Sequence, residues 1–348
     1  MGWEETLDRY SVLIEVRLRN FFAEVKNEAR TYHPFIEKVY SNMEEFVLRR
    51  GKRLASCSTL LVYKGYTGDI DAQILKVCVG IELYRHSILV HDDLVDKDEF
   101  RRGRKTFHRM FTEKNDRRLG HGTAVFAGDM MYSLALQSIV NSGFAREKLD
   151  VVLSMLFKGY CDVNESQILD LLFEYKEPNV DEWYMMASKR AASLFKTTIL
   201  VGASLGNAPE TDLHLLGEAA AHLGYSFDIQ DDIIDTFASL EQYGRPPGGD
   251  LTLGKKPLHV VYTLNRADRD GSSMLKSLCG KKHISKESLE WARQVVRESS
   301  GLEAAKEKLR GHGEKATALF AQTRLNNETK EFFTSLITYI ENSLNWYR

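Results

Sequence analysis

Two short runs of aspartates, far apart in the chain, have the composition and spacing of a site for metal-bound phosphate. Both have the pattern DDxxD, at Asp92–Asp96 and at Asp231–Asp235. In a helix, the first and last acids of each run lie on one face, one turn apart. Like charges at this spacing destabilise a helix by roughly 0.2–0.5 kcal/mol per pair, and the apolar residues around both runs add a cost of burial. A cationic ligand is therefore expected at the two runs.

Magnesium is the cation that these acids favour, because carboxylate oxygens suit Mg²⁺ or Mn²⁺. Mg²⁺ takes one or two carboxylates from a protein and fills its other positions with water and substrate phosphate oxygens. Two facing acidic helices therefore predict a diphosphate clamp, and the alternative is a pair of solvated helix ends. The candidate metal ligands are Asp92, Asp93, Asp96, Asp231, Asp232 and Asp235.

Basic residues follow the first run directly, in a turn at residues 97–105. The guanidinium groups of Arg101 and Arg102 can bind phosphate oxygens bidentately beside the metals, although a solvated loop would have the same composition. Further polar residues interrupt apolar helical runs, which is typical of a polar pocket inside a helix bundle. They are Gln167, Asp170, Lys189, Arg190, Asp228 and Lys255.

Helices must position these residues. The chain has only 6 prolines, its apolar residues recur every three or four positions, and the alternation typical of strands is rare. The sequence predicts an all-α fold that forms a single domain over residues 1–348. The predicted helices are 4–30, 34–50, 54–66, 71–97, 121–141, 146–175, 179–205, 212–240, 255–267, 286–299, 302–323 and 327–346.

Composition narrows the class of protein. A hydrophobic content of 43% supports a substantial core, and a net charge of -2 gives no general attraction to nucleic acid. No apolar run reaches the roughly 20 residues that span a membrane. The 4 cysteines are scattered without a CxxC pair, which favours reduced thiols. We expect a cytoplasmic protein with no membrane span and no nucleic-acid partner.

In its motifs the sequence resembles the trans-isoprenyl diphosphate synthases, also called polyprenyl synthetases, from about residue 50 to about residue 260. The matching segments occur in the order typical of that family. They are Gly51-Lys52-Arg53, Asp92–Asp96, Arg101-Arg102-Gly103, Gly122–Asp129, Gln167–Leu171, Lys189, Phe227–Asp235 and Asp250–Lys255.

This resemblance implies an isoprenoid synthase-type helical bundle around a deep central cavity, usually a homodimer, with about three Mg²⁺ in each active site. The implied enzyme is a prenyltransferase that condenses an allylic diphosphate with isopentenyl diphosphate. Departure of the allylic diphosphate leaves a carbocation, which the double bond of isopentenyl diphosphate attacks before a proton is lost. Catalysis then consists of stabilising the leaving group and excluding water.

The resemblance also implies roles for individual residues. The groups implied in catalysis, as metal ligands or as cations that neutralise the departing diphosphate, are Asp92, Asp96, Arg101, Lys189, Asp231 and Lys255. The groups expected in or beside the substrate sites are Lys52, Arg53, Arg85, Arg102, Gln167, Asp228, Ser87 and Tyr84. Among these, Lys52 and Arg102 would hold the diphosphate of isopentenyl diphosphate.

Two positions depart from the family pattern at the isopentenyl diphosphate pocket. Ala55 stands where the family usually has an arginine, and Arg85 stands where it usually has a histidine. The positive charge lost at Ala55 is restored at Arg85. Our first hypothesis is therefore that Lys52, Arg85 and Arg102 bind this diphosphate in a rearranged site.

Two further departures are charged. Asp228 replaces the usual glutamine before the second run, and Arg190 replaces the threonine after Lys189. Because an additional acid beside the second run would be costly unless it is paired, our second hypothesis is an ion pair between Asp228 and Arg190 across two cavity helices. The competing interpretation makes Asp228 a proton acceptor or a carbocation stabiliser.

The residues that precede the first run bear on product length. In a helix, Ile88 and Ser87 point down the cavity beneath the diphosphate. Ser87 is small where short-chain synthases of the family often place an aromatic ring, and Tyr84, a turn deeper, can form the floor. Our third hypothesis is a product of about C20 to C25, geranylgeranyl or geranylfarnesyl diphosphate.

Two other functions stay open from the sequence. Ala55, Arg85 and Asp228 are compatible with a class I terpene synthase, or with a prenyltransferase that uses another acceptor, on the same fold. A regulatory subunit without catalysis is the third function. Such a subunit needs no metal ligands, whereas both aspartate runs are intact here.

Overall fold

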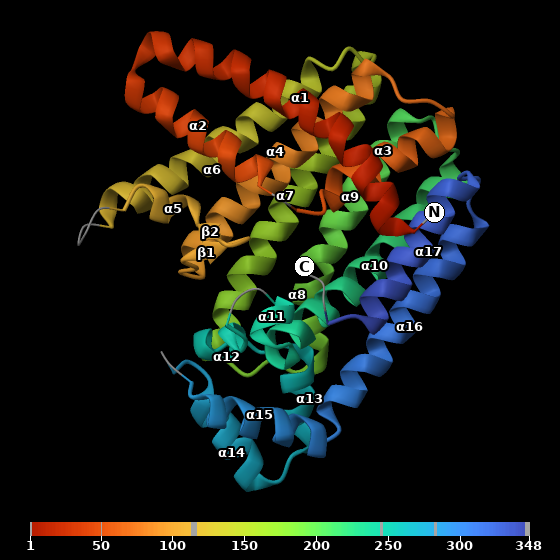
Figure 1. Ribbon diagram of the computed structural model, residues 1–348. Helices are drawn as coiled ribbons and strands as arrows, with labels where there is room; N and C mark the ends of the chain where they lie inside the picture. The colour runs from red at the N-terminus through yellow and green to blue at the C-terminus, as the bar shows by residue number, and fades with distance from the viewer. Residues whose placement is uncertain (1, 50, 113–116, 244–245, 282–283, 345–348) are drawn as a thin grey trace. The chain divides into compact units, whose positions relative to one another are not determined.

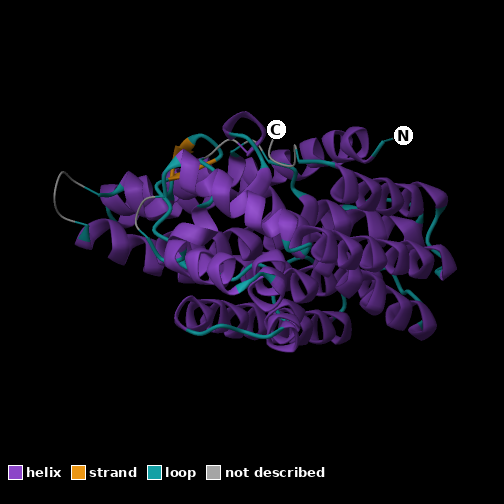
Figure 2. Ribbon diagram, turned by 90° about the horizontal axis from the view of Figure 1, so that it is seen from below, coloured by secondary structure: helices purple, strands orange, loops and turns teal. Residues whose placement is uncertain are grey.

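The computed structural model describes residues 2–49, 51–112, 117–243, 246–281 and 284–344. Over these residues the protein is almost entirely helical, which confirms the predicted all-α class (Figures 1 and 2). The strands of the described chain are β1 (Phe100–Arg101) and β2 (Arg104–Lys105), which pair antiparallel. No described helix is both long and apolar enough to cross a membrane.

The chain folds as two compact units. The first comprises Met1–Ser154, Leu200–Ala208 and Leu325–Thr329, and the second comprises Met155–Ile199, Pro209–Arg324 and Lys330–Arg348. Each unit carries one of the two DDxxD motifs, so each is described by itself.

Helix α4 is the centre of the first unit, because buried residues line it on every side. Asp71 begins this helix by accepting a hydrogen bond from the Ile74 N–H at 2.8 Å. Gly80 lets α4 approach α6 closely, since a Cβ there would lie 2.7 Å from the carbonyl oxygen of Ala135. The helices of this unit are α1 (Trp3–Tyr32), α2 (Pro34–Leu48), α3 (Leu54–Thr67), α4 (Ala72–Val95), α5 (Phe107–Met110), α6 (Arg118–Val140) and the first part of α7 (Arg146–Tyr175).

Helix α10 carries the second motif in its last turns and packs along α16 in the second unit. Trp183, Ile229 and Leu309 belong to the buried core that surrounds it. The other elements of this unit are the rest of α7, α8 (Val180–Ser188), most of α9 (Ala191–Leu205), α10 (Glu210–Phe237), α11 (Leu240–Tyr243), α12 (Gly249–Leu253), α13 (Leu258–Arg266), α14 (Arg269–Leu278), α15 (Lys286–Glu298), α16 (Gly301–Gln322) and most of α17 (Asn327–Asn342).

Most predicted helices are confirmed, with ends within a few residues of those expected. The predicted helix 179–205 is wrong as one piece, because a turn at Lys189 and Arg190 divides it into α8 and α9. Helix α14 was not predicted, since its sequence contains Gly and Ser, which are weak helix formers. The last predicted helix ends earlier, at Asn342, and its expected residues 345–346 lie outside the described chain.

Candidate active site

The first DDxxD motif closes α4. Asp92 lies in the last turn and Asp96 follows as the C-cap residue, with its N–H donating to the Asp92 carbonyl oxygen at 2.8 Å. Both side chains are partly exposed, whereas Asp93 between them is fully buried. Burial raises the pKa of Asp93 to about 7, although Arg101 acts in the opposite direction. The motif therefore offers two accessible acids and one internal acid.

Arg101, on strand β1, links the hairpin to this motif. Its Nε donates to Asp93 Oδ1, and its Nη2 lies 3.5 Å from Asp92 Oδ2 and 3.8 Å from Asp98 Oδ2. Burial acts to lower the pKa of Arg101, but these acids outweigh it and raise the pKa above its usual value. A permanently charged guanidinium is thus fixed beside Asp92.

Arg102 occupies the tip of the hairpin. Arg102 and Gly103 have φ angles of 54° and 73°, as the central pair of a type I′ turn requires. The Arg102 guanidinium lies on Gly51, where a Cβ would be 2.4 Å from Arg102 Cζ. The pKa of Arg102 is lowered to about 10, because burial and the charges of Arg101, Arg53 and Arg85 outweigh the opposite effect of Glu82. Gly51 is therefore required for this position of the Arg102 side chain.

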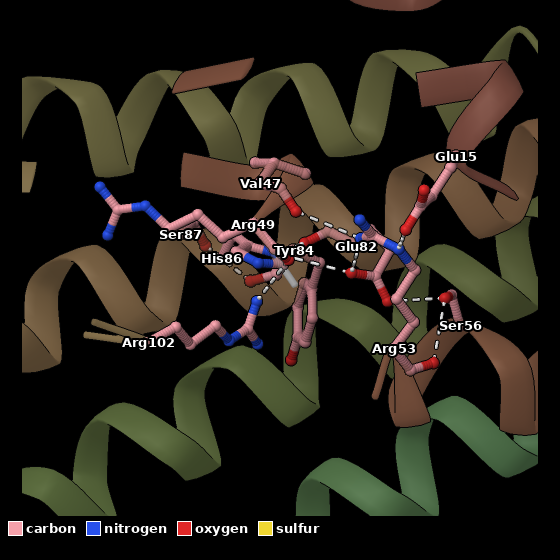
Figure 3. Close-up of polar contacts among 10 residues, drawn as sticks. All are labelled: Glu15, Val47, Arg49, Arg53, Ser56, Glu82, Tyr84, His86, Ser87 and Arg102. Atoms are coloured by element: carbon pink, nitrogen blue, oxygen red, sulfur yellow. Dashed lines mark hydrogen bonds and ion pairs between the residues drawn. The ribbon is translucent and has the colours of Figure 1, made fainter. Parts of the chain in front are cut away.

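Glu82, on α4, is the centre of a buried network in the first unit (Figure 3). It is 2% exposed, lies 3.2 Å from the Arg53 guanidinium, and accepts a hydrogen bond from the Ser56 hydroxyl at 2.6 Å. Burial acts to raise the pKa of Glu82, but Arg53, His86 and the Ser56 hydrogen bond hold it below its usual value. Burial lowers the pKa of His86 to about 3. Glu82 is therefore an ionised carboxylate inside the unit.

The start of α3 places two of the predicted cations. Arg53 has a φ of 43° and donates to Glu15 Oε1 at 2.8 Å and to the Val47 carbonyl oxygen at 3.2 Å, in addition to Glu82. These three partners all belong to the first unit. The Lys52 ammonium lies 4.4 Å from the centre of the Trp3 ring, and burial lowers the pKa of Lys52 to about 8. A nearby anion would stabilise the charged form of Lys52.

The first unit gathers more positive than negative charge around Glu82. Arg53 is in contact with this carboxylate, and the charges of Arg53 and Arg85 both lower the pKa of Arg102. Arg85 lies on α4, one turn after Glu82, and is partly exposed. The charge of Arg85 thus acts on Arg102, and the rearranged site of the first hypothesis stays a prediction. An anionic ligand would relieve their mutual repulsion.

Tyr84 and Ser87 lie on α4 below the first motif, and both are fully buried. The Ser87 hydroxyl donates to the Tyr84 carbonyl oxygen at 2.8 Å, so it is used within the helix. The Tyr84 ring lies 6.2 Å from that of Tyr132 on α6, in a tilted arrangement. Along α4, the small Ser87 is therefore nearer to the first motif and the aromatic Tyr84 is one turn further from it, which is the predicted order.

The second DDxxD motif lies near the end of α10. Asp231 is partly exposed, whereas Asp232 and Asp235 are buried. Asp235 Oδ2 accepts a hydrogen bond from the Asp250 N–H at 3.1 Å, and the Gly248 N–H donates to the Asp235 carbonyl oxygen at 2.8 Å. Asp235 thereby holds the segment that leads to Lys255.

Arg190 and Asp228 form the ion pair of the second hypothesis, which is confirmed. Arg190 Nε lies 3.1 Å from Asp228 Oδ1, and the same guanidinium lies 3.4 Å from Asp232 and 4.0 Å from Asp170. Arg190 is in the turn between α8 and α9, so the expectation that it lies on a helix is wrong. That turn exposes the Ala191 N–H, which donates to Asp228 Oδ2 at 3.2 Å. Burial raises the pKa of Asp228 to about 6, against the effect of Arg190.

The remaining predicted residues of the second unit fall into two groups. Lys255 Nζ lies 3.2 Å from Asp170, which joins it to the Arg190 network. Lys189 is more exposed and pairs with Glu165 and Asp162, two other acids of α7. Gln167 is partly exposed on the same helix. Sequence reasoning predicted the two lysines but not the acids that hold Lys189.

The acids fit a divalent ion that arrives with phosphate. Among the described residues, no three His, Cys, Asp or Glu side chains converge into a ready-made metal cage. Mg²⁺ does not need one, since it takes one or two carboxylates and completes its shell with phosphate and water. Asp92, Asp96 and Asp231 are partly exposed and suit this use. Their buried neighbours already have the internal partners described above.

Two residues of this region were missed from the sequence. Glu82 has a signal, because it is an acid inside the apolar run of α4 and a buried charge must be paired. Arg49, which follows α2 and contacts the hairpin, has none, because its neighbours Leu48 and Arg50 do not distinguish it from a solvated basic residue.

The class of protein is an all-α prenyltransferase. This class is indicated by the all-α fold together with two acidic motifs that each have basic residues beside them. The family described as polyprenyl synthetase matches residues 36–296. A short chain isoprenyl diphosphate synthase of Methanocaldococcus jannaschii is 29% identical over 281 residues, which cover 81% of this chain and 83% of that protein. A geranylfarnesyl diphosphate synthase of Aeropyrum pernix is 28% identical over 296 residues, which cover 83% of this chain and 89% of that protein.

Solved structures agree with the sequence relatives. A geranylgeranyl pyrophosphate synthetase from Pyrococcus horikoshii Ot3 has a TM-score of 0.85 at 26% identity and covers 98% of this chain and 99% of its own. A geranylgeranyl pyrophosphate synthase from Corynebacterium glutamicum has a TM-score of 0.90 at 19% identity over the same shares, which supports the fold. The chain belongs to the polyprenyl synthetase family, a family of prenyltransferases.

Proposed function

We propose that the protein is a Mg²⁺-dependent trans-prenyltransferase that condenses an allylic diphosphate with isopentenyl diphosphate to a longer polyprenyl diphosphate. The observation that carries this proposal is the fixed Arg101 beside the accessible Asp92 at the end of α4, with the same motif repeated at Asp231. Relatives named as isoprenyl and geranylfarnesyl diphosphate synthases support it. In this proposal the two units form one catalytic domain, and both motifs act on one diphosphate.

At the allylic diphosphate, Asp92, Asp96 and Asp231 would hold the metals, about three in each site by resemblance to the family. When bound, Mg²⁺ supplies positive charge to the diphosphate oxygens. The allylic C–O bond breaks, and its electron pair leaves with the diphosphate, which Arg101, Lys189 and Lys255 neutralise. These charges are worth most where water is excluded. The double bond of isopentenyl diphosphate then forms the new C–C bond, and loss of a proton completes the product.

For isopentenyl diphosphate, we propose that Lys52, Arg85 and Arg102 bind the diphosphate group. Burial lowers the pKa of both Lys52 and Arg102, and a bound anion would raise both pKa values by stabilising the charged forms. Arg53 would act on this site only indirectly, because its side chain is buried and already paired with Glu15 and Glu82.

Replacing Arg85 by Ala is expected to raise the KM for isopentenyl diphosphate by about 10-fold or more, because a charge-assisted hydrogen bond contributes roughly 1.5–3 kcal/mol. The KM for the allylic diphosphate should stay within about two-fold. Steady-state kinetics with each substrate varied in turn measure both constants. Lys76→Ala, at an exposed position of the same helix, is the control. An unchanged KM for isopentenyl diphosphate would rule out the rearranged site.

The main product is expected to have about C20 to C25, since Ser87 is small at the position where short-chain synthases of the family often place an aromatic ring, and Tyr84 lies a turn deeper along α4. Chromatography of the dephosphorylated products measures the chain length. Ser87→Phe should shorten the product, because it places such a ring at this position. A dominant C15 product from the unaltered protein would contradict this assignment.

One incubation separates the proposed function from the others. Purified protein receives Mg²⁺ and an allylic diphosphate, with or without isopentenyl diphosphate, and products are identified by mass. Elongation that depends on isopentenyl diphosphate supports the proposal. Hydrocarbon or alcohol from the allylic diphosphate alone indicates a class I terpene synthase, the second candidate because of Ala55, Arg85 and Asp228. No product under either condition indicates a regulatory subunit.

We also propose a homodimer. Helix α6 exposes Leu119, Val125 and Phe126, the last of them 68% exposed. A second copy that covers Phe126 would gain roughly 1.5–3 kcal/mol at each ring. Phe126→Glu is therefore expected to yield monomers where the unaltered protein is dimeric, as measured by light scattering after size exclusion. Ser133→Glu, an exposed polar position on the same helix, is the control, and a monomeric parent protein would refute the proposal.

A cytoplasmic location is proposed from the cysteines. Cys57, Cys78, Cys161 and Cys279 are all free, and Cys161 is exposed. Free thiols persist in a reducing compartment. The partners that we propose are the two small diphosphates and a second copy of the chain, without nucleic acid.

A further inference from the structure

The β1–β2 hairpin, which carries Arg101 and Arg102, is held by the side chain of Arg49. This residue follows α2 directly and is 6% exposed. Its Nη1 donates to the Arg101 carbonyl oxygen at 3.3 Å, and its Nη2 donates to the Lys105 carbonyl oxygen at 2.7 Å. These carbonyl groups belong to the two strands. One guanidinium therefore ties both strands to the end of α2.

The Arg49 guanidinium is itself fixed in place. Its Nε donates to both carboxylate oxygens of Glu45, at 3.1 and 3.0 Å, and its Nη2 lies 2.8 Å from one of them. The Phe46 ring lies beneath it, with its centre 4.9 Å from Arg49 Cζ. A planar, forked group can satisfy a carboxylate and two carbonyls at once, whereas an ammonium cannot match this geometry.

The hairpin needs such a support. Each strand has two residues, and a two-stranded hairpin alone is marginally stable. Arg102 adopts a left-handed conformation that most residues avoid, and it returns a hydrogen bond to the Arg49 carbonyl oxygen at 3.3 Å. A pocket of about 420 Å³, which Arg49, Arg102 and Arg104 help to line, adjoins this hairpin. Packing on that side is therefore incomplete.

We propose that Arg49 is the positioning residue for both diphosphate-binding arginines. It acts through the hairpin backbone. By holding both strands, it fixes the direction of the Arg101 side chain on β1 and of the Arg102 side chain in the turn. A displacement of about 1 Å at such groups lowers turnover by about 100-fold. This proposal rests on the roles given above to Arg101 and Arg102.

The test compares Arg49→Gln with Arg104→Gln. Both arginines pair with Glu45. Arg104, however, is part of the hairpin, and its side chain is 67% exposed. Arg49→Gln is expected to raise the KM for the diphosphate substrates by about 10-fold and to lower kcat/KM by about 100-fold, with faster amide exchange over residues 101–105. Arg49→Lys should recover only part of this loss. Arg104→Gln should stay within about two-fold of the parent in every constant.

A milder variant guards against misfolding. Glu45→Gln weakens the anchor of Arg49 at a partly exposed carboxylate and is expected to raise the same KM values by about 5-fold. The positioning role is overturned if Arg49→Gln and Glu45→Gln both behave like Arg104→Gln while Arg101→Gln loses activity. Absence of elongation by the unaltered protein would overturn the proposed function instead.

Discussion

Replacing Glu82 by Gln is expected to destabilise the first unit by about 3–5 kcal/mol, the usual effect of removing one partner of a buried ion pair. The substitution keeps the size of the side chain but removes the buried carboxylate partner of Arg53 and leaves it only the partly exposed Glu15. It also removes a negative charge that acts to raise the pKa of Arg102. Urea unfolding with linear extrapolation measures the loss. Glu44→Gln is the control, since the partly exposed pair of Glu44 with Lys26 should contribute less than about 1 kcal/mol.

The effect of Glu82 has a defined pH dependence. The pKa of Glu82 in the folded protein lies below its ordinary value of 4.5, so the unfolded chain takes up the proton first as pH falls. The stabilisation is therefore fully present above pH 4.5 and is lost as pH falls through the lower native pKa. The difference between the parent and Glu82→Gln should shrink on acidification below that point. A loss at neutral pH no larger than that of Glu44→Gln would show that the Arg53–Glu82 pair contributes nothing.

The helices that carry both motifs were predictable because their apolar periodicity is long and uninterrupted. Helix α7 is found at Arg146–Tyr175, as expected, and α4 and α10 end near the predicted residues. The hairpin at Phe100–Lys105 was predicted only as a basic turn, because two-residue strands contain no alternation that a sequence can display. Its strands accept hydrogen bonds from Arg49, which follows α2 and is distant in the sequence.

The charged pairs of the candidate site were predictable, but the backbone turn that places one of these charges was not. The substitutions at Asp228 and Arg190 correctly predicted an ion pair, since an added acid requires an added base. The turn that places Arg190 was not predictable, because apolar residues recur with helical spacing on both sides of it and no Gly or Pro stands at the break. There a tertiary contact, the Ala191 N–H on Asp228, offsets the loss of helical hydrogen bonds.

The two motifs use their second aspartate in the same way. Asp93 is buried and accepts from Arg101, and Asp232 is buried beside Arg190. Burial raises the pKa of both acids, while the first aspartate of each motif stays partly exposed. Each DDxxD motif thus contains one acid that is committed to an internal arginine. This division of roles could not be read from two identical patterns.

Replacing Arg190 by Thr is expected to cost about 3–5 kcal/mol of stability in the absence of metal, because Asp228 and Asp232 are then buried without a cation. Asp228→Gln in the same chain should recover at least about 1.5 kcal/mol, since it removes one of the unpaired charges. Urea unfolding of the parent, the two single variants and the double variant, all in a chelating buffer, completes the double-mutant cycle. Additive effects would contradict the coupling of Arg190 with Asp228.

Added Mg²⁺ should stabilise Arg190→Thr more than it stabilises the parent protein. In the parent, the Arg190 guanidinium lies 3.4 Å from Asp232 and competes with any cation for that carboxylate. Without Arg190, Asp232 is available, and a ligand that binds the folded state stabilises it by RT ln(1 + [L]/Kd). The unfolding free energy measured across a Mg²⁺ titration reports this difference without substrate or turnover. An equal Mg²⁺ effect in both proteins would mean that Arg190 neutralises Asp228 alone and leaves the metal ligands of the second motif unchanged.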